Sequence, residues 1–259
     1  MTLDSRGDGL KRILRPLIER ARVVRTRALS LVMQPRQLWQ RELRSEVRFW
    51  KEYLDGKGLQ FSEDYATRLN PETPLQLDLA ELLGLSDGPV RVLDVGAGPL
   101  TVLGKNYQGR KLDITAVDAL ADAYDEELRK LSVVPPVRTT ACETEKLTNR
   151  FGTGVFDLVY AQNTLDHTYD PARCVREMVA VGKPGAVIAA RHKNDEARVE
   201  AYEGLHQWNL TVEDGRWLLW NRSNRIDLFE EVAADADPIL VKDEGDWHFV
   251  ALRKRRLHD

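Results

Sequence analysis

The chain has 259 residues, a length that fits one α/β catalytic core with a helical extension. With 42% hydrophobic and 31% charged residues, its composition excludes a fibrous or largely disordered protein. The net charge of −3 conceals an asymmetry, because residues 11–51 hold 12 Lys or Arg against 3 Glu and the remainder is acidic.

Cysteine content and apolar runs predict a cytoplasmic location. Cys142 and Cys174 lie far apart and form no CxxC pair, so neither a disulfide framework nor a cysteine zinc site is expected. No run of about 18 apolar residues occurs, and the N-terminus lacks the apolar segment of a secretion signal. We therefore expect no transmembrane segment.

The N-terminal part of the chain is predicted to be helical. Apolar residues recur at helical spacing, with arginines between them, through residues 10–33. A second helix is expected from Pro35 through Tyr53. We assign residues 1–75 to an N-terminal helical extension and residues 76–259 to the main domain.

The basic amphipathic segment of residues 10–33 admits several roles. It could touch an anionic membrane surface, act as a lid or hold an anionic acceptor. Packing of its apolar stripe on the main domain or on a second subunit is favoured, so a homodimer stays open. Nucleic-acid binding is not expected, because the basic residues are not interleaved with aromatic ones and the whole chain is acidic.

Strand and helix patterns alternate through the main domain, which predicts βαβ units and a parallel sheet. Strands are predicted at residues 91–95, 114–117, 137–141, 156–161 and 186–190. Helices are predicted at residues 75–83, 120–131, 171–181 and 195–202. Strands near residues 217–220 and 247–252 are expected to form an antiparallel pair that closes the sheet.

The first strand of the main domain ends in the sequence DVGAG, residues 94–98. Its glycines permit a tight turn and leave room for a nucleoside-type ligand, although an ordinary strand-to-helix turn can have the same sequence. A dinucleotide site would have a third glycine where this chain has Thr101, and no Gly-Lys-Ser/Thr sequence follows to bind phosphate. NAD and ATP are therefore disfavoured.

Four segments in order resemble class I S-adenosylmethionine-dependent methyltransferases. VLDVGAGP at residues 92–99 resembles motif I, and Asp118 stands where the family binds the ribose hydroxyls. ACE at residues 141–143 resembles the adenine contact, and FDLVYAQ at residues 156–162 the motif of the fourth strand. Taken singly, Asp118 could cap a helix and Glu143 could be a surface charge.

The resemblance implies a Rossmann-like α/β fold, a seven-stranded mostly parallel sheet with helices on both faces, plus the N-terminal helical extension. It also implies S-adenosylmethionine as the cofactor. The implied cofactor contacts are Asp94, Gly96, Ala97, Gly98, Asp118, Ala119, Cys142, Glu143 and Gln162.

Methyl transfer from a sulfonium requires alignment of the acceptor and, for an alcohol, removal of its proton. The groups that do this are expected beyond the fourth and fifth strands, where ligands of open α/β sheets lie. His167 is the predicted general base, with Asp166 beside it as a catalytic partner. Alternatively, His167 caps the helix that follows Asp170.

Residues 202–209 combine aromatic, amide and imidazole side chains, a mixture that suits stacking on a sugar ring. Together with NTLDH at residues 163–167, they are similar to bacterial methyltransferases encoded with glycan-modifying enzymes. We therefore predict methylation of a sugar hydroxyl in a bacterial glycan or glycoside. The predicted acceptor contacts are Asn163, His192, Asn194, His206, Gln207, Trp208 and Asn209.

Other outcomes stay open. Trp208 could belong to the core, the acceptor could be a phenol or an amine, and the fold could serve binding without catalysis. A divalent cation such as Mg²⁺ could acidify the acceptor hydroxyl. Its ligands would come from Asp166, His192, Glu196 and His206, although no HExxH-like spacing supports a metal site.

Overall fold

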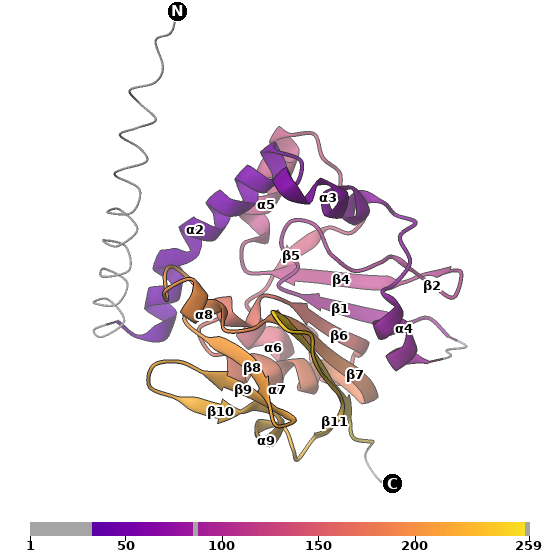
Figure 1. The fold of residues 1–259 in the computed structure, drawn as a ribbon. Coiled ribbons are helices and arrows are strands. Elements are labelled where there is room, and N and C mark those ends of the chain that lie inside the picture. The colour runs from indigo at the N-terminus through magenta and orange to yellow at the C-terminus, as the bar shows by residue number, and fades with distance from the viewer. Residues whose placement is uncertain (1–32, 85–87, 257–259) are drawn as a thin grey trace, which may run out of the picture.

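The computed structural model describes residues 33–84 and 88–256, and a seven-stranded sheet forms their centre (Figure 1). The strand order is β11-β12-β7-β6-β1-β4-β5, and the five strands from β7 to β5 run parallel. This order confirms the predicted Rossmann-like fold. The parallel strands are β1 (Arg91–Val95), β4 (Asp113–Asp118), β5 (Thr139–Ala141), β6 (Phe156–Gln162) and β7 (Gly182–Lys193).

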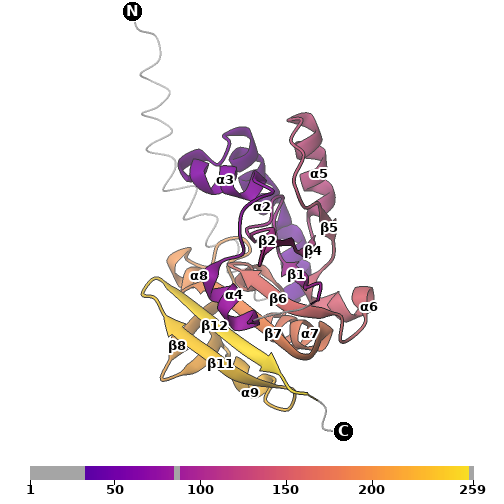
Figure 2. The same cartoon turned by 90° about the vertical axis from the view of Figure 1, so that its right-hand side faces the viewer.

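Helices cover both faces of this sheet, as predicted. One face carries α6 (Leu147–Phe151), α7 (Pro171–Val181) and α9 (Leu228–Glu231). The other carries α4 (Leu77–Leu83) and a small hairpin, β2 (Asn106–Tyr107) and β3 (Arg110–Lys111). Figure 2 shows β12 (Trp247–Lys254) and β11 (Ala236–Asp243) at one edge of the sheet and α5 (Ala121–Lys130) near the other.

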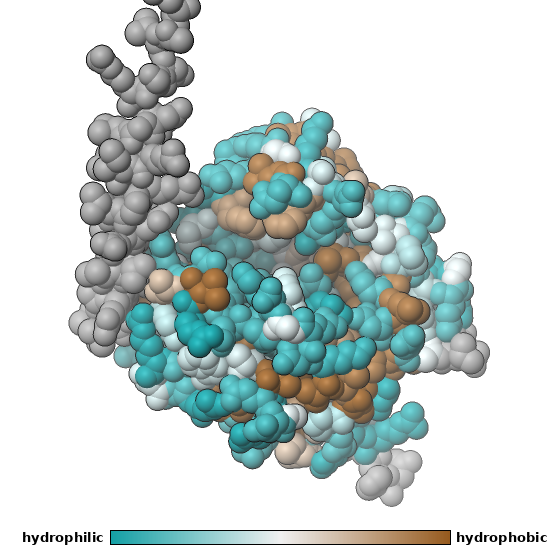
Figure 3. All heavy atoms as spheres, in the orientation of Figure 1, coloured by the Kyte–Doolittle hydropathy of each residue, from teal (hydrophilic) through white to brown (hydrophobic). Residues whose placement is uncertain are grey.

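The predicted second helix is present as α2 (Pro35–Asp55), followed by η1 (Leu59–Phe61) and α3 (Ser62–Leu69). Tyr53 and Leu54 of α2 and Tyr65 of α3 pack with Leu100 and Leu128 of the main domain. Figure 3 shows a hollow beside α2 on this face of the molecule. The division of the chain at residue 75 stays a prediction, and the predicted amphipathic segment lies almost wholly outside the described residues.

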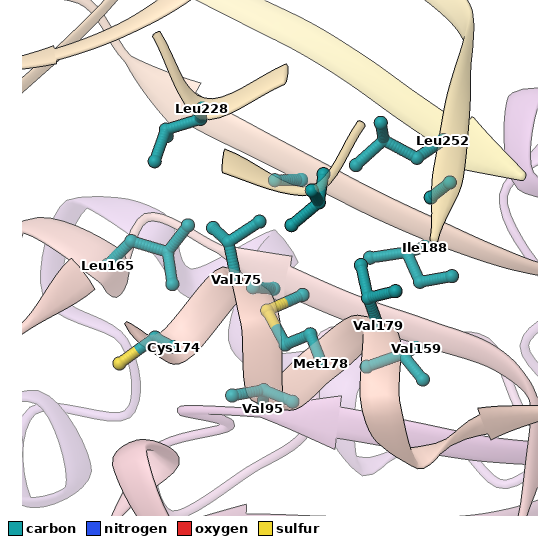
Figure 4. Packing of buried hydrophobic residues seen from close by; sticks show 14 of the residues in the cluster. Val95, Val159, Leu165, Cys174, Val175, Met178, Val179, Ile188, Leu228 and Leu252 are labelled. Carbon is teal, nitrogen blue, oxygen red and sulfur yellow. The ribbon is translucent and has the colours of Figure 1, made fainter. Parts of the chain in front are cut away.

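The packing of α7 shows why its bounds were predictable. Pro171 stands at the first helical position, where no backbone N–H is needed, and the Asp170 side chain accepts from the Arg173 N–H at 3.0 Å. Val175, Met178 and Val179 are spaced to face the sheet, and Figure 4 shows them among buried aliphatic side chains. The predicted helix over residues 171–181 is confirmed.

The predicted pairing of the last strands was wrong. β12 lies between β7 and β11, whereas β9 (Arg216–Trp220) joins β8 (Asn209–Glu213) and β10 (Arg225–Asp227) in a separate antiparallel sheet. β11 escaped prediction because it is a mostly exposed edge strand containing Pro238, and its three consecutive apolar residues, at 239–241, do not alternate with polar ones. Likewise α8 (Glu196–Val199) is shorter than predicted, because Ala201 and Tyr202 have positive φ.

Candidate active site

A cavity of about 740 Å³ opens at the carboxyl ends of β1, β4 and β6, where the strand order reverses. Its volume falls within the roughly 300–1,000 Å³ typical of small-molecule sites. From the sheet side it is lined by Asp94, Gly96, Ala97, Asp118, Ala119, Gln162 and Asn163, all predicted from the sequence. From α2 it is lined by Trp39, Leu43, Glu46 and Trp50, which share one helical face.

The glycine loop after β1 is held between two side chains. Gly96 and Gly98 have φ of +65° and +63°, a region that side-chain-bearing residues rarely adopt. A Cβ on Gly96 would lie 2.0 Å from Thr164 Oγ1, and one on Gly98 would lie 2.7 Å from Trp50 Cζ2. The loop therefore requires glycine for its turn and for the close approach of Thr164 and Trp50.

Asp118 ends β4 with its carboxylate fixed by the backbone. The Gly98 N–H donates to Oδ2 at 3.1 Å and the Leu120 N–H donates to Oδ1 at 2.8 Å. Burial raises the pKa of Asp118 to about 6, although both N–H groups oppose this shift. Each carboxylate oxygen keeps a lone pair for a further donor, so the residue fits the ribose hydroxyls of a nucleoside cofactor.

Thr101, at the position where a dinucleotide site would have glycine, donates a hydrogen bond to the buried Asp94 carboxylate. Burial raises the pKa of Asp94 to about 6. Lys105, another buried residue, has no hydrogen-bond partner for its Nζ among the described residues, and burial lowers its pKa to about 8. The Asp94 carboxylate is therefore buried close enough to the Lys105 ammonium for the two charges to interact.

Three of the predicted cofactor contacts are not among the described residues that line the cavity. They are Gly98, Cys142 and Glu143. The Glu143 carboxylate already accepts from Arg36 Nη2 at 2.8 Å and from the Tyr169 hydroxyl at 3.0 Å, with Lys146 Nζ at 2.9 Å. Its predicted contact with adenine stays a prediction. Thr144 and Glu145, the next residues along the chain, do line the cavity.

Asp166 lies in η3 (Leu165–His167), and its carboxylate is fully buried among three histidines. Its Oδ1 lies 3.0 Å from His192 Nε2, and its Oδ2 lies 2.7 Å from His206 Nδ1. His167 Nε2 lies 3.1 Å from that same His206 Nδ1. Burial disfavours the charged carboxylate, but the three imidazoles hold the pKa of Asp166 well below its usual value.

The structure brings the two predicted catalytic residues together and adds Glu46, which sequence analysis missed. Glu46 Oε2 lies 3.7 Å from His167 Nδ1. Burial lowers the pKa of His167, but the charges of Asp166 and Glu46 outweigh it and leave the pKa raised. The signal for Glu46 was its place on the helical face of α2 that carries Trp39 and Trp50, where an acidic residue interrupts an otherwise aromatic and apolar pattern.

The predicted acceptor contacts are scattered. His206 and Asn163 line the main cavity, whereas Gln207 and Trp208 line a second cavity of about 350 Å³. Asn209 is fully buried, and its Oδ1 accepts from the Arg198 N–H at 2.8 Å. Two further predicted contacts are engaged elsewhere: Asn194 with His248 and Gly245, and His192 with Asp166 and the Lys193 carbonyl.

Part of the chain that lines this cavity matches a known family. Residues 93–190 match the family described as "Methyltransferase domain". The chain is 27% identical over 212 residues to the ubiquinone biosynthesis O-methyltransferase of Hahella chejuensis, which covers 74% of this chain and 87% of that protein. An uncharacterised methyltransferase of Schizosaccharomyces pombe is 28% identical over 148 residues, covering 54% of this chain and 51% of its own length.

A solved structure shares the fold. A chain from the complex between the Haloferax volcanii Trm112 methyltransferase activator and a methyltransferase is 12% identical, with a TM-score of 0.54. The match covers 83% of this chain and 99% of that chain, and at this identity it shows the fold alone. The family match therefore spans the glycine loop, Asp118 and His167, and it ends before His206.

Proposed function

We propose that this protein methylates a hydroxyl oxygen of a small-molecule acceptor that binds beside His167 and His206. The observation that carries the proposal is that both imidazoles line the same cavity as the glycine loop and Asp118, with the Asp166 carboxylate buried behind them. When bound, S-adenosylmethionine supplies a sulfonium methyl group, whose bond to sulfur breaks as the acceptor oxygen bonds to its carbon. The chain's own task is to hold that oxygen and remove its proton.

Removal of the proton is assigned to His167, the base predicted from the sequence. Asp166 and Glu46 lie on either side of its ring, with Asp166 Oδ2 at 3.4 Å from Nε2 and Glu46 Oε2 at 3.7 Å from Nδ1. Two carboxylates beside one imidazole stabilise the cation that forms when the ring accepts a proton. His206 then orients the pair through its contacts with both residues.

Two observations bear on the class of the acceptor. The name of the Hahella relative supports transfer to oxygen. The aromatic wall of Trp39, Phe49 and Trp50 suits a flat or ring-shaped acceptor, which includes the sugar predicted from the sequence and a phenol. Because Gln207, Trp208 and Asn209 lie away from this cavity, the sugar proposal now depends on that wall, on Asn163 and on His206.

Transfer of a labelled methyl group tests the proposal. The full chain would be incubated with S-adenosylmethionine carrying a tritiated methyl group and with matched panels of glycosides, phenols and amines. We expect label in hydroxyl-bearing acceptors, and a His167→Ala variant that binds S-adenosylhomocysteine normally but transfers label at least about 100-fold more slowly. Label confined to amines, or transfer unchanged in the variant, would contradict the proposal.

A further inference from the structure

Three atoms that can each bind a proton or a metal ion converge beside the cavity. Asp166 Oδ2, His206 Nδ1 and His167 Nε2 are separated by 2.7, 3.1 and 3.4 Å. If His206 Nδ1 carries a hydrogen toward Asp166, His167 Nε2 faces the same hydrogen with its lone pair. If His167 Nε2 carries it instead, His206 Nδ1 is an acceptor and its contact with Asp166 has no hydrogen.

These separations fit ligands of one metal ion. Nitrogen and oxygen ligands lie about 2.1 Å from a divalent first-row metal, so adjacent ligands are about 3.0 Å apart in octahedral and about 3.4 Å apart in tetrahedral geometry. We propose that Asp166, His167 and His206 bind one divalent transition-metal ion, which holds the acceptor oxygen. This inference rests on the proposed methylation of a hydroxyl.

The groups behind the three ligands support the site. Histidines that bind metal commonly donate their second N–H to a carboxylate, and Glu46 Oε2 lies 3.7 Å from His167 Nδ1. Carboxylates that bind metal are in turn hydrogen-bonded, and His192 Nε2 lies 3.0 Å from the other Asp166 oxygen. Glu46 therefore lies beside one proposed ligand and His192 contacts another, while neither is itself one of the three ligands.

A second grouping, Asp166 with His192 and Glu196, is less suited to an ion. Their potential ligand atoms lie within 4.8 Å of one another, but both His192 nitrogens already have partners, Asp166 and the Lys193 carbonyl at 2.9 Å. His192 is 1% exposed and does not line the cavity. The ligand set that we propose therefore includes His167 and leaves out His192 and Glu196, which the sequence analysis had included.

The donor set also selects the metal. Mg²⁺ prefers six oxygen ligands, whereas imidazole suits Zn²⁺, Fe²⁺, Co²⁺ and related ions. Two imidazoles and one carboxylate leave coordination positions open toward the cavity. A hydroxyl bound there loses its proton to solvent near neutral pH, because the ion stabilises the alkoxide. With the ion bound, His167 is one of its ligands; the base role proposed above is that of His167 in the metal-free site.

Metal binding by the full chain tests the site without any assay of activity. Protein dialysed against a chelator would be titrated with Co²⁺, followed by visible absorption, and with Zn²⁺, followed by calorimetry. We expect one ion per chain and no displacement by millimolar Mg²⁺. Asp166→Asn and His206→Gln should weaken binding at least about 100-fold, and Glu46→Gln about 10–100-fold.

Controls separate a built site from incidental binding. Cys142→Ser removes the partly exposed thiol and should leave binding unchanged. Retained affinity for S-adenosylhomocysteine shows that a variant is folded. Absence of Co²⁺ and Zn²⁺ binding below millimolar concentration, or equal binding by wild type and the Asp166→Asn variant, would overturn the inference.

Activity then distinguishes this inference from the proposed function. If chelated protein methylates hydroxyls at an unchanged rate, the metal inference fails and the proposed function stands. If the ion binds as expected but no hydroxyl accepts a methyl group, the proposed function fails and the metal site stands.

Discussion

His248 couples the stability of the fold to pH through two buried contacts. The Trp217 Nε1–H donates to His248 Nε2 at 3.1 Å, and His248 Nδ1 lies 2.7 Å from Asn194 Oδ1. With Nε2 accepting, the neutral ring donates from Nδ1, so a proton added at Nε2 breaks the contact with Trp217. Burial, followed by the charge of His192, lowers the pKa of His248 from 6.5 to about 3.

We predict that acid destabilises the protein through this residue. Between the unfolded value of 6.5 and the folded value of about 3, the unfolded chain binds a proton that the folded chain does not, so stability falls as the pH falls. Between about pH 7.5 and about pH 5, the wild type should lose about 2 kcal/mol more unfolding free energy than His248→Gln. Urea denaturation at both pH values measures this difference; an equal loss in both proteins would refute the assignment.

Two carboxylates that are predicted to contact the cofactor, those of Asp118 and Glu143, differ in the partners that they already have. Asp118→Asn replaces an acceptor of the Gly98 and Leu120 N–H groups by an amide that cannot serve both, so affinity for S-adenosylhomocysteine should fall about 10–100-fold. Glu143→Gln should change affinity less than about threefold, because Arg36 and Tyr169 already hold that carboxylate. Calorimetry measures the affinity of both variants for S-adenosylhomocysteine. Equal losses of affinity would support the adenine contact predicted for Glu143.

At the scale of elements, α2 closes the cavity against the glycine loop. Gly98→Ala would place a Cβ 2.7 Å from Trp50 Cζ2 at a φ of +63°. Gly109→Ala is the matched control, because its φ is +72° and nothing lies within 4 Å of the added Cβ. We predict a loss of about 1 kcal/mol in the control and about 2–4 kcal/mol in Gly98→Ala.

Chemical denaturation of both variants measures the contact between α2 and the loop. Trp50→Ala should recover about 1 kcal/mol in a Gly98→Ala background, relative to its own effect in the wild type, because it removes the clashing ring. Equal destabilisation by Gly98→Ala and Gly109→Ala would mean that α2 does not press on the loop.

Elements with strong local signals could be predicted from the sequence. α7 has a capping Asp170, a first-turn proline and an apolar face. β1 is an apolar run that ends in a glycine turn. Both elements therefore lie at the residues where they were predicted. β11 could not be predicted, because an exposed edge strand needs no apolar face. Residues 206–209 do not form one surface, although the sequence predicted them together as acceptor contacts. The reason is that β8 begins at Asn209 and turns that side chain into the protein.

Across the molecule, the candidate site depends on contacts between distant parts of the chain. Asp118 and the glycine loop follow from motif resemblance within residues 93–190, but Glu46 meets His167 only because α2 folds over the sheet. No local pattern encodes that contact, since the two residues are separated by the entire first half of the domain.

Among the described helices, none combines the length and apolarity needed to cross a lipid bilayer.

The identity of the new bond tests the central claim most directly. Reaction of the full chain with S-adenosylmethionine carrying a ¹³C-methyl group, followed by NMR of the methylated product, shows which atom receives the methyl group. We predict a methyl ether on an acceptor hydroxyl, with its formation slowed at least about 100-fold by Asp166→Asn. A methyl group on nitrogen, or no transfer by protein that binds S-adenosylhomocysteine, would contradict the account.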